Sequence, residues 1–340
     1  MTQPPGAALP TGRAGWAGVR VVVHGFDESM AGVAATDNLL FLGASVTALD
    51  EAAVGQEVRE RAELLRTLGA TIRLEAGATS TLPGEVDLVI DAADDDVMDL
   101  PRGGLLQQAE ARGVPVWSDA ELAWRLRDDD APPWLLAAGE DDDLGVAFQV
   151  AELTAAMALS AGLRADFAGT GGVPLVEAVM DPEQSDVLCV GLSARQLAHS
   201  TSIAAESAVV LGHAPVLAGA YERVRVACVY VDEVTERFVM DAEVAEGARA
   251  IGLTLDMPSV SMLGVVENIL VDRAFIAERQ TSAAELATLD DLDQVTPTTV
   301  REHLAAAALA RAHGLSQAAV RDGIRGFNCI TWGGDEHDDE

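Results

Sequence analysis

The chain has 340 residues, of which 49% are apolar, and it carries a formal net charge of −33. This charge makes nucleic acid and anionic membrane surfaces poor partners, because both would be repelled. No run of about 18 apolar residues exists, so the sequence also predicts no membrane span. The three cysteines have no paired spacing, which favours buried free thiols in a reducing cytoplasm. We therefore expect a cytoplasmic protein that is long enough for two domains.

The N-terminal segment, residues 1–18, is rich in Pro, Gly and Ala and lacks the order of a signal peptide, so it is interpreted as a flexible lead-in. Over residues 19–130, apolar strand-like runs alternate with helix-like segments. This order predicts an α/β domain with a parallel, doubly wound, Rossmann-like sheet. The polar, proline-ended stretch 127–133 marks the predicted domain boundary. Strands are expected at 19–25, 44–50, 71–74, 86–91 and 114–117, and helices at 31–42, 58–68 and 105–112.

The second predicted domain, residues 131–330, repeats this logic. It opens with an apolar strand at Trp134, and a hairpin is expected over 262–271 around Glu267 and Asn268. The tail, 331–340, is acidic and is predicted to be disordered. Further strands are expected at 187–190, 208–211 and 224–230, and helices at 146–161, 300–313 and 317–323.

Residues 134–157 have the layout of a phosphate-binding strand, loop and helix. The loop opens at Gly139 and continues with four carboxylates, Glu140, Asp141, Asp142 and Asp143. A nucleotide phosphate at a helix N-terminus needs bare backbone N–H groups, Gly for close approach, and a Lys. The Lys is absent here and negative charges replace it. The sequence therefore predicts a scaffold for a nucleotide whose phosphate chemistry has been lost.

Long segments of the chain resemble the Mur ligases, and most closely the actinobacterial enzymes that add D-glutamate to UDP-N-acetylmuramoyl-L-alanine. The resemblance implies a UDP-binding-type domain over 19–130 and a central, P-loop ATPase-type domain over 131–330. The chain ends where the third, C-terminal domain of that family would begin, so this domain is expected to be missing. The segments that carry the resemblance are 35–50, 112–127, 173–190, 246–253, 262–289 and 304–326.

In the Mur ligases a Gly-rich turn after the first strand holds the UDP moiety. The resemblance places Gly25 and Ser29 in this turn, but Asp27 stands where the family has Gly. Asp27 and Glu28 precede a predicted helix, where they would compete with a diphosphate for the same N–H groups. A weakened nucleotide site is therefore expected.

Two further residues complete this remnant of a UDP site. Asp50 matches the acid that recognises uracil or ribose in the family, although a polar residue that ends a strand is an equally good interpretation. Thr170 lies in a Gly-rich, substrate-contacting loop, 168–174, at a position where the family has Asn. Such a loop by itself also fits a simple turn.

The resemblance implies ATP and magnesium as cofactors, but their sites are predicted to be lost. The metal-binding Glu of the family falls at Gly191, which offers no oxygen ligand to magnesium. Most of the segment with the family's metal-binding His and modified Lys is deleted after Leu211, and the adenine-packing motif falls at 298–302 without its residues. The acidic runs 94–96, 128–130 and 141–143 could chelate calcium, but none has the spacing of a calcium loop. No catalytic residue, metal site or cofactor is therefore predicted.

Three functional hypotheses follow. The first is a non-catalytic, Mur-ligase-like pseudoenzyme that acts as a protein-binding, regulatory or assembly module linked to cell-wall synthesis, with a protein partner or its own copies. The second is a sensor that binds a UDP-muramoyl nucleotide through the first domain. The third is an ATP-dependent D-glutamate-adding ligase with residual activity. Because several separate parts of the ATP site are expected to be missing, the sequence alone favours the first hypothesis and leans against an enzyme.

Overall fold

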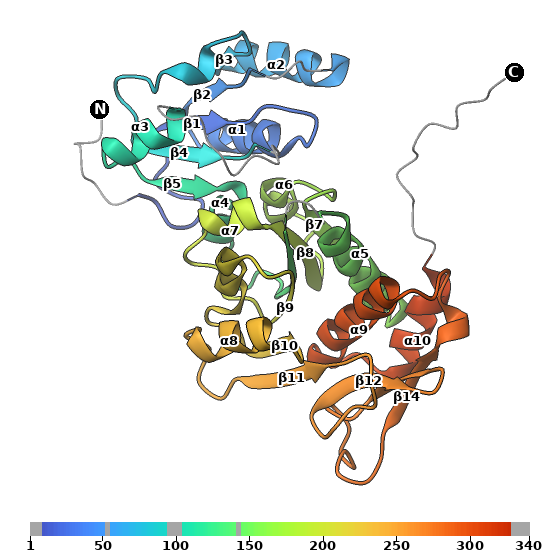
Figure 1. Cartoon of the computed structure of the whole chain (residues 1–340). Helices are drawn as coiled ribbons and strands as arrows, with labels where there is room; N and C mark the ends of the chain where they lie inside the picture. The colour runs from blue at the N-terminus through green and yellow to red at the C-terminus, as the bar shows by residue number, and fades with distance from the viewer. Residues whose placement is uncertain (1–8, 52–54, 94–103, 141–143, 328–340) are drawn as a thin grey trace, which may run out of the picture.

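The computed structural model describes residues 9–51, 55–93, 104–140 and 144–327, and these form two α/β units (Figure 1). The first unit has a five-stranded sheet in the order β3-β2-β1-β4-β5. The second has a nine-stranded sheet in the order β14-β13-β12-β11-β10-β9-β6-β8-β7. The predicted α/β class with parallel sheets is therefore confirmed. Within the described residues, no helix is long and apolar enough to span a bilayer. The acidic tail 331–340 lies outside them.

Every neighbouring strand pair of the first sheet is parallel, as the alternation of strands and helices predicts. Residues 21–23 of β1 are buried, which explains the run of β-branched residues there. The sequence does not predict α4, which begins directly after β5, where the Ser118 side chain accepts the N–H of Glu121. The strands are β1 (Arg20–His24), β2 (Ser45–Leu49), β3 (Thr71–Arg73), β4 (Leu88–Asp91) and β5 (Val116–Ser118); the helices are α1 (Ala31–Phe41), α2 (Gln56–Leu68), α3 (Leu105–Ala111) and α4 (Asp119–Leu126).

The second sheet is parallel from β7 to β12 and antiparallel at its far edge. The predicted hairpin is confirmed, because β12 and β13 pair antiparallel and Glu267 takes the left-handed turn conformation with φ 57°. The strands are β6 (Trp134–Gly139), β7 (Ala165–Gly169), β8 (Val187–Ser193), β9 (Ser207–Leu211), β10 (Val226–Tyr230), β11 (Arg249–Leu253), β12 (Met262–Val266), β13 (Ile269–Asp272) and β14 (Ala284–Thr288).

Two long helices pack together on the second unit. The Ala-rich α9 lies against α5, and its residues 304–310 are fully buried, because small side chains let the two helices approach closely. Cys189 on β8 and Cys228 on β10 are free and buried, and burial raises the pKa of both thiols. The helices are α5 (Leu144–Ser160), α6 (Leu175–Met180), α7 (Ala194–Ala198), α8 (Glu233–Asp241), α9 (Pro297–Ala312) and α10 (Gln317–Gly326).

Of the N-terminal segment 1–18, the structure describes residues 9–18, and these pack against both units. Trp16 is fully buried and meets Trp117 edge-on at 6.5 Å between ring centroids. Arg13 donates hydrogen bonds to the carbonyl oxygens of Leu126 and Val179, one in each unit. The Trp16 ring and the two hydrogen bonds from the Arg13 guanidinium thus hold this part of the segment in place, although it is rich in Gly.

The stretch 127–133 connects the two sheets. Arg127 stacks on Trp124 at 4.0 Å from the ring centroid, and Trp124 meets Trp134 edge-on at 5.0 Å. Burial lowers the pKa of Arg127 to about 10. The connection between the units is therefore packed by aromatic and cation–π contacts.

Candidate active-site cleft

A cavity of about 400 Å³ lies where the two units meet. The turn after β1 and the start of α4 contribute one side, and the loop 169–172 with the start of α7 contributes the other. The carboxyl ends of parallel strands converge here, which is where open α/β sheets bind ligands. The cavity is lined by Glu28, Ser29, Met30, Ala31, Ala92, Ala93, Asp119, Gly169, Thr170, Gly171, Gly172, Pro174, Ser193 and Gln196.

A chain of hydrogen bonds forms the floor of this cleft. Asp119 is fully buried at the start of α4 and accepts from the Nε2 of Gln196 at 2.9 Å. The Oε1 of Gln196 contacts the hydroxyl of Thr170 at 3.1 Å and accepts from the backbone N–H of Ser193 at 3.0 Å. Burial raises the pKa of Asp119 to about 6, although the hydrogen bond from Gln196 opposes this shift. A residue of the first unit therefore holds a side chain of the second.

A buried ion pair lies beside this chain. Asp91, at the end of β4, accepts from Arg195 of α7 at 2.8 and 3.0 Å and from His24 of β1 at 2.9 Å. Its side chain is only 1% exposed. Burial alone would raise the pKa of Asp91, but the hydrogen bonds from His24 and Arg195 outweigh it and lower the pKa. His199 lies 3.8 Å away on another side of this carboxylate, and burial lowers the pKa of its imidazole.

The predicted remnant of a UDP site is only partly brought together. Ser29 and Thr170 both line the cleft. Gly25 follows β1 with φ 91°, and the backbone of Ala92 and Ala93 leaves no room for a side chain there. Asp50 accepts the backbone N–H of Phe26 at 2.5 Å, so it holds the turn after β1 in place. Gly25 and Asp50 are not among the residues that line the cavity.

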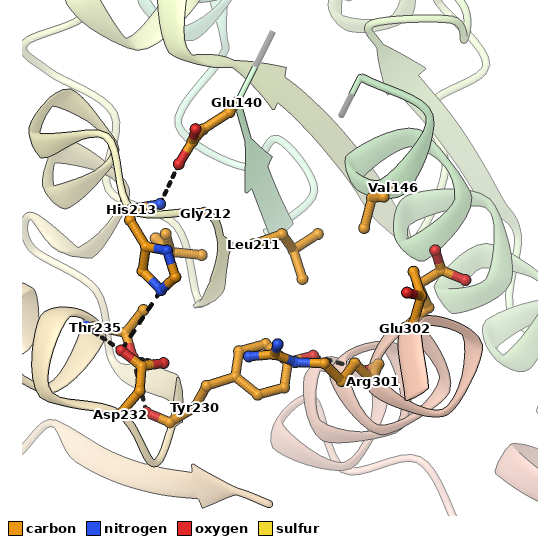
Figure 2. A pocket seen from close by; sticks show the side chains of 12 residues that line it. Glu140, Val146, Leu211, Gly212, His213, Tyr230, Asp232, Thr235, Arg301 and Glu302 are labelled. Atoms are coloured by element: carbon orange, nitrogen blue, oxygen red, sulfur yellow. Dashed lines mark hydrogen bonds and ion pairs between the residues drawn. The ribbon is translucent and has the colours of Figure 1, made fainter. Parts of the chain in front are cut away.

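A second cavity, of about 310 Å³, lies at the carboxyl ends of β6, β9 and β10, with Glu140 in its lining (Figure 2). Glu140, His213 and Asp232 lie on one side of it, and Arg301 and Glu302 of α9 lie on the other. Glu140 accepts the backbone N–H groups of His213 and Ala214, so two donors of the loop after β9 are already used. Asp141, Asp142 and Asp143 lie outside the described residues.

The described lining of this second cavity is richer in acids than in bases. The carboxyl groups of Glu140, Asp232 and Glu302 line it, whereas Arg301 and His213 are its cationic or titratable nitrogen side chains among the described residues. The guanidinium of Arg301 stacks on Tyr230 at 4.4 Å from the ring centroid. Within the described part of the chain, no group of three or more His, Cys, Asp or Glu side chains gathers as a metal site. Among its described residues the lining has one aromatic ring, that of Tyr230, and few donors for phosphate oxygens.

Glu302 provides a pH-dependent test of this lining. The residue is 7% exposed, and burial raises the pKa of its carboxyl to about 7. A carboxyl with a raised pKa stabilises the fold fully below its ordinary pKa, near 4.5, and this contribution is lost as the pH rises through about 7. We expect Glu302→Gln to be more stable than the unmodified protein at pH 8 by about 1–2 kcal/mol, after solvent screening, and equally stable near pH 4.5. Urea unfolding at both pH values checks this, with the exposed Glu246→Gln as control, and an equal gain at both pH values would contradict it.

No family model matches the chain. It is 42% identical over 330 residues to a UDP-N-acetylmuramoylalanine–D-glutamate ligase from Streptomyces avermitilis, covering 92% of this chain and 68% of that protein. The chain belongs to the Mur ligase family. Ligases of the same name from Streptomyces coelicolor and Leifsonia xyli are 41% and 38% identical, over 92% and 94% of this chain and 68% and 66% of theirs.

A solved structure supports the fold. The UDP-N-acetylmuramate:L-alanyl-gamma-D-glutamyl-meso-diaminopimelate ligase from Neisseria meningitides matches with a TM-score of 0.55, over 92% of this chain and 99% of that one. The identity is 13%, so this likeness concerns the fold alone. The chain spans about two thirds of the length of the relatives named above.

These relatives correct the functional hypothesis that the sequence favours. Four Mur ligases that are 36–42% identical over more than nine tenths of this chain all carry the name of a D-glutamate-adding ligase. The hypothesis of a non-catalytic pseudoenzyme is therefore contradicted. That hypothesis rests on substitutions at single positions of the phosphate site, whereas the similarity to the ligases extends over most of the chain. The ligase hypothesis agrees better with these relatives.

Sequence reasoning missed the residues that join the two units in this Mur ligase fold. Asp91, Asp119, Arg195 and Gln196 were not singled out, although the two acids end or follow predicted strands. That position was the available signal, because strand ends of a parallel sheet face the ligand cleft. Their partners lie 77 and 104 residues away along the chain, which no local pattern reveals.

Proposed function

We propose that the chain serves the addition of D-glutamate to UDP-N-acetylmuramoyl-L-alanine, and that the cleft between the two units binds this muramoyl nucleotide. The observation that carries the proposal is the 42% identity to a ligase of that name over 92% of the chain. The cleft supports it, because it joins both units and has a small-residue loop, 169–172, that lets a large polar ligand approach the backbone.

The start of α1 gives a place for the phosphates of such a ligand. This 11-residue helix begins at the cleft after Met30, whose side chain makes no capping bond, and the Ser29 hydroxyl accepts the N–H of Ala31. Free N–H groups and the helix dipole favour an anion at this end. Asp27 accepts hydrogen bonds from the backbone and hydroxyl of Ser29, so its carboxylate is turned toward its own loop. The turn thus combines an attractive helix end with a nearby acid, and moderate affinity is expected.

The proposal is tested with the purified chain in two steps. Calorimetric titration measures binding of UDP-N-acetylmuramoyl-L-alanine, with UDP-glucose as the control ligand. ADP formation is then followed with ATP–magnesium, D-glutamate and the muramoyl nucleotide, and each is left out in turn. We expect binding of the muramoyl nucleotide and ADP formation that requires all three compounds. Binding without any such ADP formation, or no binding, would overturn the proposal.

Glu140 gives a second, directional test. Its carboxylate lines the second cavity and would repel a nucleotide triphosphate. Glu140→Gln removes the charge but keeps an oxygen that can accept from the N–H groups of His213 and Ala214. One charge at about 4 Å is worth about 1 kcal/mol in water, so we expect the KM for ATP–magnesium to fall about fivefold. Glu243→Gln, at an exposed site, is the control, and an unchanged or higher KM in Glu140→Gln would contradict the prediction.

A further inference from the structure

We propose that Thr170 determines specificity in the cleft by accepting a hydrogen bond from an amide N–H of the muramoyl nucleotide. Asp119 and Ser193 orient the side-chain amide of Gln196, and this orientation leaves the Thr170 oxygen as a hydrogen-bond acceptor toward the cleft. The inference rests on the proposed function for the ligand, but its argument comes from the hydrogen bonds of the cleft floor.

The orientation of the Gln196 amide is fixed from two sides. An ionised carboxylate can only accept, so Asp119, at 2.9 Å, must face the amide nitrogen. A backbone N–H can only donate, so the N–H of Ser193, at 3.0 Å, must face the amide oxygen. Rotating the amide by half a turn would put two acceptors together and two donors together. Both contacts therefore select the same orientation.

This orientation decides what Thr170 can offer to a ligand. The Oε1 of Gln196 lies 3.1 Å from the Thr170 hydroxyl and is an acceptor, so the hydroxyl hydrogen is donated downward to it. A hydroxyl has one hydrogen and two lone pairs. The oxygen of Thr170 therefore faces the cleft as an acceptor only, and it favours a ligand N–H over a carboxylate or carbonyl at that point.

The loop is rigid enough for this preference to be selective. The backbone N–H of Thr170 donates to the carbonyl oxygen of Gly191 at 3.0 Å, and Gly169 has φ 100° with no room for a Cβ beside Gly191. The Thr170 hydroxyl is thus held by both its backbone and its side chain. UDP-N-acetylmuramoyl-L-alanine carries amide N–H groups in its acetamido arm and at its alanine, and either supplies the donor that this acceptor requires.

The test combines protein variants with altered ligands. The probes are UDP-N-acetylmuramoyl-L-alanine and two analogues, each with one of the two amide N–H groups replaced by an ester oxygen. Calorimetry measures the dissociation constants for the unmodified protein, Thr170→Ser and Thr170→Val. For the unmodified protein and Thr170→Ser we expect one ester analogue to bind about tenfold more weakly than the parent, the usual scale of one hydrogen bond. Thr170→Val should bind the parent and that analogue equally.

Asp119 is tested as a positioning residue. Asp119→Asn keeps an oxygen for the Gln196 amide and should preserve the discrimination between amide and ester. Asp119→Leu removes it and should reduce the discrimination, while far-ultraviolet circular dichroism checks that the variant is folded. If the parent binds but Thr170→Val shows the same loss with the ester analogue as the unmodified protein, this inference fails and the proposed function stands. If the parent does not bind the unmodified protein, the proposed function itself fails.

Discussion

Replacing Arg195 by methionine is expected to lower the free energy of unfolding by about 3 kcal/mol, because it leaves the Asp91 carboxylate buried without its main cation. The Asp91 side chain is 1% exposed and that of Arg195 is 11% exposed, so water cannot take the place of the lost guanidinium. Methionine keeps much of the packing volume of the aliphatic stem, which isolates the loss of charge and hydrogen bonds. Urea unfolding monitored by tryptophan fluorescence measures the change.

The matched control is Arg164→Met. Arg164 also makes a two-point contact with an acid, Asp186, but both side chains are well exposed, so little or no change is expected there. Equal effects at the two sites would show that burial does not set the strength of the Asp91 pair. In Arg195→Met, His24 remains as a hydrogen-bond partner of Asp91 at 2.9 Å, so the carboxylate keeps one contact but loses its guanidinium.

The sequence predicts the long or strongly apolar elements of the fold and misses the short helices. The sequence predicts the strands β1 and β2 within one residue at each end, because buried parallel strands consist of short, continuous apolar runs. The helices α6, α7 and α8 were not predicted, and each is short enough that its apolar spacing covers fewer than three turns. A helix or strand can thus be predicted from the sequence when its apolar pattern extends over enough residues.

The sequence predicts only some residues of the cleft, because others are brought there by tertiary contacts. Thr170 could be placed in a ligand loop because its neighbours are glycines, which is a local signal. Its partner Gln196 and the carboxylate of Asp119 lie on other elements, and their roles come from three-dimensional proximity. For Asp50 the sequence leaves two interpretations, an acid that binds the ligand and a polar residue that ends a strand, and in the structure its carboxylate accepts the N–H of Phe26. A hydrogen bond of this kind depends on the three-dimensional course of the turn, which no local pattern reveals.

Gly25→Ala is expected to destabilise the first unit strongly, although it adds only one methyl group. Gly25 has φ 91°, a conformation that costs an L-residue about 1–2 kcal/mol by itself. A Cβ there would lie 2.3 Å from the backbone nitrogen of Ala93 and 2.6 Å from the carbonyl carbon of Ala92. These neighbours are backbone atoms, and the N–H of Ala92 donates to the carbonyl oxygen of His24, so they cannot turn aside as a side chain would.

The expected cost is therefore on the order of 3 kcal/mol or more, a large share of the stability of an ordinary domain. Thermal unfolding measures it, with Gly84→Ala as the control, because a Cβ at Gly84 meets nothing within 4 Å. The change should also weaken binding in the cleft, since the turn after β1 carries Ser29 to the cavity wall. A Gly25→Ala variant as stable as Gly84→Ala would show that the turn after β1 can move away from the residues that follow β4. The close approach of Gly25 to Ala93 would then not determine the position of this side of the cleft.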